Sequence, residues 1–140
     1  MAAYHQHFQP SARQPAPAGS IGVFVVCADT EEEALRLARS RDLWLLRLYR
    51  GDLKPVPTAA EVEAHTYTDR DRAIIRHNRS RPIAGAPEQV RDRLTALASA
   101  YGVDELVVLT ICESYAARLK SYELLAEAFA LERPVVVTAA

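Results

Sequence analysis

Three short apolar segments, each followed by a helical pattern, constrain what this chain can fold into. They are residues 20–28, 81–86 and 105–111, and the first and third are apolar at both odd and even positions. Strands that are apolar on both faces are typical of parallel sheets whose two faces are covered. Strands that alternate with helices imply crossover connections between parallel strands. The sequence therefore predicts an α/β fold.

The helices between and after these segments have recognisable starts and stops. The first is expected over residues 31–50, with Thr30 and Glu33 forming a capping box and Gly51 ending it. The second is expected to begin at Pro87, which suits the first helical position, and to end at Gly102. The third is expected over residues 114–130, and its core-facing stripe is predicted to be Tyr115, Leu119, Tyr122, Ala126 and Phe129.

The two ends of the chain are expected to pack loosely. Residues 1–19 contain three prolines and form an extended lead-in, in which Tyr4 and Phe8 have the spacing of a short helical turn. Residues 131–140 form a tail, and its valines extend as a strand or remain loose.

The stretch between the first helix and the second apolar segment is expected to be an insertion. It covers about residues 52–80 and begins with a Pro-punctuated loop. Thr58 with Glu61, and Thr68 with Asp71, have the spacing that starts a helix. The insertion is therefore predicted to contain two short helices.

Charge, hydropathy and cysteine usage narrow the class of protein. The net charge is −1, from 17 basic and 18 acidic residues, which argues against a nucleic-acid or anionic-membrane surface. No run of about 18 apolar residues exists, and the first residues lack the apolar core of a secretory signal. We expect a cytoplasmic protein in which Cys27 and Cys112 are buried free thiols.

Three motifs resemble the bacterial luciferase-like, flavin-dependent monooxygenases. They are FQPS with the following IGVFVVCADTEEEA, then IAGAPEQVRDRL, and then DELVVLT with AARLKSYELLAE. Together they cover most of residues 8–130 apart from the insertion. The resemblance implies an oxidoreductase in which reduced flavin and O₂ oxygenate an organic substrate. FMN is the flavin that the resemblance implies, with a deazaflavin as the alternative.

This family has a (β/α)₈ barrel, and the resemblance makes the three apolar segments barrel strands six, seven and eight. A complete barrel takes roughly 250 residues, and the chain has 140. Residues 20–130 are therefore expected to form a partial TIM barrel, the last three β/α units, with little or no activity alone. The expected partners are a complementing chain or a second copy of this chain, with a small organic substrate once a complete barrel is assembled.

The candidate cofactor contacts are Gly85 and Ala86. Their backbone N–H groups precede a helix N-terminus, where phosphates bind, although plain turn geometry is the alternative for this common helix start. The family usually has Ser or Thr where Ala86 stands, so the N-cap hydroxyl is missing. Cys112 and Glu113 either line a flavin pocket in an intact barrel or are a strand-end thiol and a solvated carboxylate. The sequence identifies no catalytic residue.

Histidines and arginines supply the remaining candidates. His5 and His7 lack a third ligand nearby, so no metal site is expected, and His65 and His77 have no nucleophile at a suggestive spacing. The basic stretch of residues 70–81 fits a solvated helical face better than nucleic-acid contact, and contact with an anionic cofactor is a third reading. Its arginines are Arg70, Arg72, Arg76, Arg79 and Arg81.

A second function class stays open beside the enzyme. Three parallel strands leave two unpaired sheet edges, which favour pairing with another chain. The chain is then a truncated, non-catalytic relative that self-associates or binds a partner. Bound flavin favours the enzyme, and a flavin-free homodimer favours the non-catalytic module.

Overall fold

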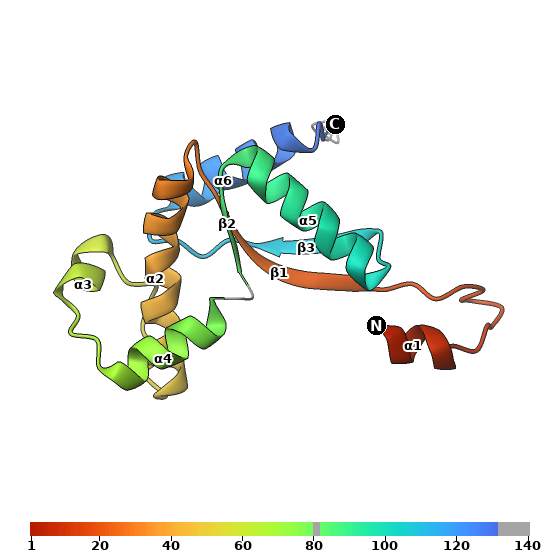
Figure 1. The fold of residues 1–140 in the computed structure, drawn as a ribbon, viewed down its shortest axis with the longest axis horizontal. Coiled ribbons are helices and arrows are strands. Elements are labelled where there is room, and N and C mark those ends of the chain that lie inside the picture. Colours follow the sequence, from red (N-terminus) through yellow and green to blue (C-terminus); the bar gives the residue numbers. More distant parts are fainter. Residues whose placement is uncertain (80–81, 132–140) are drawn as a thin grey trace, which may run out of the picture.

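Three parallel strands form the centre of the molecule. The computed structural model describes residues 1–79 and 82–131. The strands are β1 (Ser20–Cys27), β2 (Ile83–Gly85) and β3 (Glu105–Leu109), and β1 lies between the other two (Figure 1). The predicted α/β class and parallel strand direction are confirmed.

The neighbours of β1 use different parts of it. β2 pairs only with its carboxyl-terminal end, from Val25 opposite Ile83 to Cys27 opposite Gly85. β3 pairs with its first half, from Ser20 opposite Glu105 to Phe24 opposite Leu109.

The strand order is not the chain order that consecutive strands of a closed barrel follow, in which β2 would be central. β2 has three residues, too few to run along the whole length of β1. β3 pairs directly with the first half of β1, on the other side of β1 from β2.

Helices cover both faces of β1, as its two-sided apolar pattern predicts. Helix α2 (Glu31–Tyr49) packs on one face, and helices α5 (Pro87–Tyr101) and α6 (Tyr115–Ala128) pack on the other. The α2 face is a cluster of Val26, Ala28, Ala34, Leu37 and Cys112. The α5–α6 face is a cluster of Val23, Val25, Cys27, Ile83, Val90, Leu94, Leu124 and Leu125.

The predicted helix limits are confirmed by their caps. Thr30 Oγ1 accepts from the Glu33 amide at 3.2 Å, although the Glu33 carboxylate turns to Arg36 and does not complete the capping box. Gly51 and Gly102 adopt φ values of 75° and 61° after α2 and α5, a left-handed geometry that glycine adopts readily. Local sequence signals therefore fix where these helices begin and end.

The insertion contains the two predicted short helices, α3 (Ala59–Ala64) and α4 (Asp69–Asn78). Thr58 and Thr68 each accept from the amide three residues on, and Glu61 and Asp71 accept in return from the threonine amides. Both capping boxes are complete. Helix α4 lies against α2, so the insertion is anchored to α2 (Figure 1).

The lead-in carries a third short helix, α1 (Ala2–His7). The Tyr4 and Phe8 rings meet edge to face with centroids 5.7 Å apart, which confirms the predicted turn. The Tyr4 hydroxyl donates to the Ala18 carbonyl at 3.1 Å. Within the described ranges, the helices are too short or too polar to cross a lipid bilayer.

Two burial predictions near the end of the chain are wrong. Val107 and Leu109 are about half exposed, at 54% and 50%, because β3 pairs with β1 and only its other face meets helices. In α6 the buried residues are Ser121, Leu124 and Leu125. The predicted stripe contributes no buried residue, with Tyr115 72% exposed, because α6 packs on β1 through the neighbouring side of its surface. The predicted tail lies outside the described residues beyond Leu131.

One side-chain hydrogen bond joins α6 to the central strand, and it is testable. Ser121 is fully buried, and its Oγ accepts from the Cys27 amide at 2.9 Å. Replacing Ser121→Ala leaves a buried N–H without a partner, which costs about 1–3 kcal/mol. We expect a lower urea midpoint with an unchanged slope. Ser99→Ala, at an exposed position inside α5, is the matched control and should be neutral or slightly stabilising; equal midpoints for the two variants would contradict the assigned role of Ser121.

Candidate functional site

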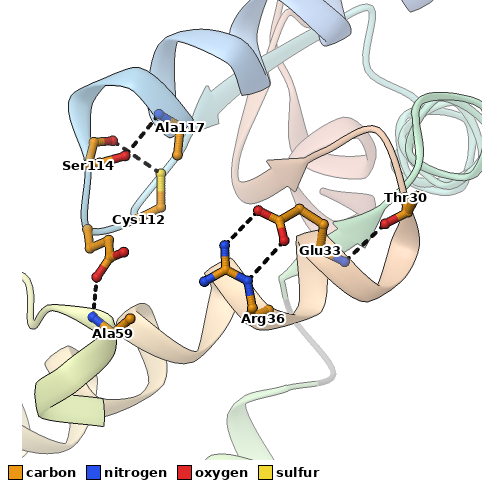
Figure 2. Close-up of polar contacts among 8 residues, drawn as sticks. Thr30, Glu33, Arg36, Ala59, Cys112, Ser114 and Ala117 are labelled. Carbon is orange, nitrogen blue, oxygen red and sulfur yellow. Dashed lines mark hydrogen bonds and ion pairs between the residues drawn. The ribbon is translucent and has the colours of Figure 1, made fainter. Parts of the chain in front are cut away.

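The loops that follow the strands meet the first turns of the helices and the insertion. Figure 2 shows Thr30, Glu33 and Arg36 of the α2 end beside the loop that carries Cys112 and Ser114. The Glu113 carboxylate accepts from the Ala59 amide at the start of α3 (Figure 2). Glu113 is therefore a tether between the β3–α6 loop and the insertion.

The two cysteines are buried free thiols, as predicted. Burial, with a smaller contribution from Asp29, raises the pKa of the Cys27 thiol to about 11. Burial also raises the pKa of Cys112, against the opposing charge of Arg118. Because the thiolate is the nucleophilic form of cysteine, neither environment activates its thiol.

Gly85 and Ala86, the predicted cofactor contacts, have protein partners. The Gly85 carbonyl accepts from Ala28 N at 3.3 Å, and a Cβ on Gly85 would lie 2.9 Å from Gln89 Oε1. The Ala86 amide donates to that same oxygen at 3.0 Å. Gln89 Nε2 in turn donates to Glu31 at 3.1 Å, which brings a carboxylate to the start of α5. Binding of a phosphate at Gly85 and Ala86 stays a prediction.

Most of the predicted arginine cluster gathers around a cavity between α2 and α4. The cavity has a volume of about 280 Å³. Arg70 is not among its lining residues, and Arg81 lies outside the described part of the chain. The lining consists of Arg39, Asp42, Tyr67, Arg72, Ile75, Arg76 and Arg79.

Two lining residues from α2, Arg39 and Asp42, were missed by sequence reasoning. Asp42 is 6% exposed and accepts from Arg79 Nε and Nη2 at 3.0 and 2.9 Å. Burial raises the pKa of the Asp42 carboxyl, while the Arg79 hydrogen bonds oppose that rise. A buried acid in an Arg-rich helix was the available signal, because such a residue needs a cationic partner.

Arg41 lies on the other side of Asp42. Its guanidinium carbon is 4.4 Å from the centre of the Phe24 ring, and its Nη1 is 3.9 Å from Asp42 Oδ1. Burial lowers the pKa of Arg41. Asp42 thus has three cationic neighbours, Arg79, Arg41 and Arg39, of which Arg79 alone makes hydrogen bonds to it.

The histidines are dispersed. His7 Nδ1 is 2.9 Å from the Ala3 carbonyl oxygen, and the His5 ring meets Tyr4 edge to face. His65 packs edge to face on Tyr67 with ring centroids 4.7 Å apart. No group of three or more His, Cys, Asp or Glu side chains suited to a metal ion occurs among residues 1–79 and 82–131.

The chain resembles known proteins over most of its length. It is 42% identical over 126 residues to the uncharacterised protein YceB of Bacillus subtilis, which covers 90% of this chain and 38% of YceB. It is 25% identical over 121 residues to a luciferase-like monooxygenase of Escherichia coli, covering 86% of this chain and 36% of that protein. No protein-family model matches the chain.

A solved structure supports the same likeness. The crystal structure of apo-MsnO8 superposes with a TM-score of 0.75 and 31% sequence identity, covering 94% of this chain and 40% of that one. The resemblance found in the three motifs is supported as a distant similarity to a luciferase-like monooxygenase. The chain spans about two fifths of the length of the relatives that it matches.

The raised pKa of Cys27 predicts a loss of stability at alkaline pH. The ordinary thiol value is 9.0 and the folded value is about 11, so the unfolded chain loses this proton first. The free energy of unfolding should therefore fall as pH rises from about 9 to about 11. Urea midpoints across this window measure the effect. A Cys27→Ala variant is the reference, because it lacks this thiol and keeps every other residue, and an identical pH slope for the two would count against the prediction.

Proposed function

We propose that this chain is the C-terminal part of a luciferase-like, flavin-dependent monooxygenase. The observation that carries the proposal is the superposition on apo-MsnO8, which extends over 94% of this chain at 31% identity. The named relative from Escherichia coli supports the same class of protein. In this class the bound flavin supplies the redox chemistry, while the protein binds, orients and shields it from water.

The described residues do not by themselves form a flavin site. The Ala86 amide, at the predicted phosphate position, is hydrogen-bonded to Gln89. Glu31, which binds the same Gln89 side chain, would repel a phosphate there. We therefore propose that a flavin site requires further β/α units. FMN is the proposed flavin, with a deazaflavin as the alternative.

Two open apolar surfaces support the need for further units. A cavity of about 610 Å³ lies between α5, β3 and α6. On the opposite side of β3, Val107 and Leu109 are half exposed. Surfaces of this kind mark sites where other protein packs. The cavity is lined mostly by apolar side chains, among them Leu94, Leu106, Val108, Leu125 and Phe129.

The second candidate function is a non-catalytic module that self-associates. Among the described residues β3 is an edge strand of the sheet, and this edge and the same apolar surfaces favour it. The two candidates differ in what covers the surfaces: different β/α units in the enzyme, and a second copy of this chain in the module.

Complementation separates the two candidates. The chain is purified alone and is also co-expressed with the part of YceB that it does not match. We expect the chain alone to leave FMN fluorescence unchanged. The co-expressed pair should co-purify and carry FMN, and it should consume O₂ when a reductant is supplied. FMN binding by the chain alone would refute the proposed dependence on other units. A flavin-free homodimer that does not bind the YceB segment would refute the proposed monooxygenase function and favour the non-catalytic module.

The open face of β3 predicts a variant that affects association more than folding. Leu109→Glu places a carboxylate on the half-exposed face, so the urea midpoint of the chain alone should change little. Desolvating an unpaired carboxylate under a partner is costly, so co-purification with the YceB segment should be lost. Leu53→Glu is the control at a position 82% exposed in the insertion, and it should leave co-purification intact. Loss in both variants, or in neither, would contradict the assignment of this face.

A further inference from the structure

The cavity between α2 and α4 is lined by residues of both helices, and most of its lining side chains are charged. Arg39 and Asp42 come from α2, and Tyr67 comes from the link between α3 and α4. Helix α4 contributes Arg72, Ile75 and Arg76, and Arg79 is the residue that caps its C-terminus. Figure 1 shows α4 crossing α2 at the end of the molecule away from β3. The cavity is therefore separate from the apolar surfaces that further β/α units would cover.

The positive charge around this cavity is not matched by the described acids. Four arginines face one aspartate. That aspartate, Asp42, is already hydrogen-bonded by Arg79. Neither a hydrogen bond nor an ion pair connects Arg39, Arg72 or Arg76 to another residue within 1–79 and 82–131.

Neighbouring arginines of the same region behave differently. Arg36 pairs with Glu33 at 2.7 Å, Arg47 pairs with Glu61 at 2.8 Å, and Arg50 pairs with Asp71. Acids are thus available in this part of the molecule, yet Arg39, Arg72 and Arg76 form no hydrogen bond or ion pair with a described acid, and Arg79 is the cavity arginine that has such a partner. The cluster also costs stability, because like charges four residues apart on a helix repel one another, as Arg72 and Arg76 are placed to do.

The other lining groups indicate what an anionic ligand would carry. Tyr67 is half-buried, and no hydrogen bond joins its hydroxyl to another described residue. Ile75 offers an apolar contact. The volume of about 280 Å³ lies at the low end of ligand pockets, which span about 300–1,000 Å³. These lining groups and this volume suit a small ligand with an anionic head and a short organic part.

From these observations we propose that the cavity between α2 and α4 binds a small organic phosphate monoester. Guanidinium groups are planar forks that bind phosphate oxygens in pairs of hydrogen bonds. A dianionic head with three terminal oxygens engages Arg39, Arg72 and Arg76 together, whereas a carboxylate has two oxygens and one charge. Tyr67 donates to the head, and Ile75 contacts the organic part. This site does not depend on the proposed flavin chemistry.

Binding of phenyl phosphate to the purified chain tests the proposal, with inorganic phosphate and benzoate as comparison probes. Titration calorimetry at fixed ionic strength should give the tightest binding for phenyl phosphate and the weakest for benzoate. Arg72→Gln, Arg76→Gln and Arg39→Gln should each weaken phenyl phosphate binding about tenfold or more, the usual effect of losing a hydrogen bond between charged groups. Arg70→Gln, on α4 but outside the cavity, should bind like the unchanged protein.

Stability without ligand gives an independent readout. Because removal of one like charge relieves repulsion, Arg76→Gln should keep or raise the urea midpoint in phosphate-free buffer and should gain less from added phenyl phosphate. Unchanged affinity in the three cavity variants would overturn the proposal, as would benzoate binding as tight as phenyl phosphate. Equal weakening in Arg70→Gln would also overturn it, since the effect would then reflect the charge of the whole helix. Arg39 lies on α2, so the Arg39→Gln variant still tests the proposal if the substitutions at Arg72 and Arg76 disturb the folding of α4.

Discussion

The structure depends on β1, because every other layer of the fold is assembled on it. It pairs with β2 through one part of its length and with β3 through another. Its two faces nucleate the two apolar clusters, one with α2 and the other with α5 and α6. The strand is apolar at successive positions because both of its faces lose contact with water. In an α/β protein the central strand is buried on both faces more completely than the strands at the edges, so it needs apolar side chains on both faces.

Charged pairs join the insertion to α2, in addition to the burial of Val62 of α3. Asp42 of α2 and Arg79 at the end of α4 join across the interface as a largely desolvated carboxylate with an arginine. Arg47 and Arg50 near the end of α2 bind the acids that also cap α3 and α4. The same acids therefore start the short helices and fasten them to α2. Three arginines that have no acidic partner among the described residues line the cavity. The use of nearby acids to hold the insertion on α2 therefore also leaves an excess of positive charge at the cavity.

Sequence reasoning succeeded where the deciding interactions are local. The capping boxes at Thr58 and Thr68 involve residues three apart, and Gly51 and Gly102 mark turns that depend on their own backbone angles. It failed on the buried side of α6, where the apolar spacing was compatible with a stripe through Tyr115. The side that packs on β1 instead presents Ser121 to an amide of that strand, and this choice depends on a contact between distant segments. Only part of the cavity lining could be predicted, for the same reason. The arginines of α4 form a pattern in the sequence, whereas the contribution of α2 depends on how the two helices cross.

The pairing of Ser20 with Glu105 also bears on how the chain reaches its folded state. The first half of β1 obtains its partner only after α2, the insertion and α5 have been synthesised. Closing so long a loop is slow compared with forming helices, and proteins dominated by such pairings fold slowly. Until then the first half of the central strand is a hydrophobic segment without its partner β3, the kind of transient exposure that favours aggregation and engages chaperones. The element that organises the native molecule is thus the one most in need of protection while the protein is being made.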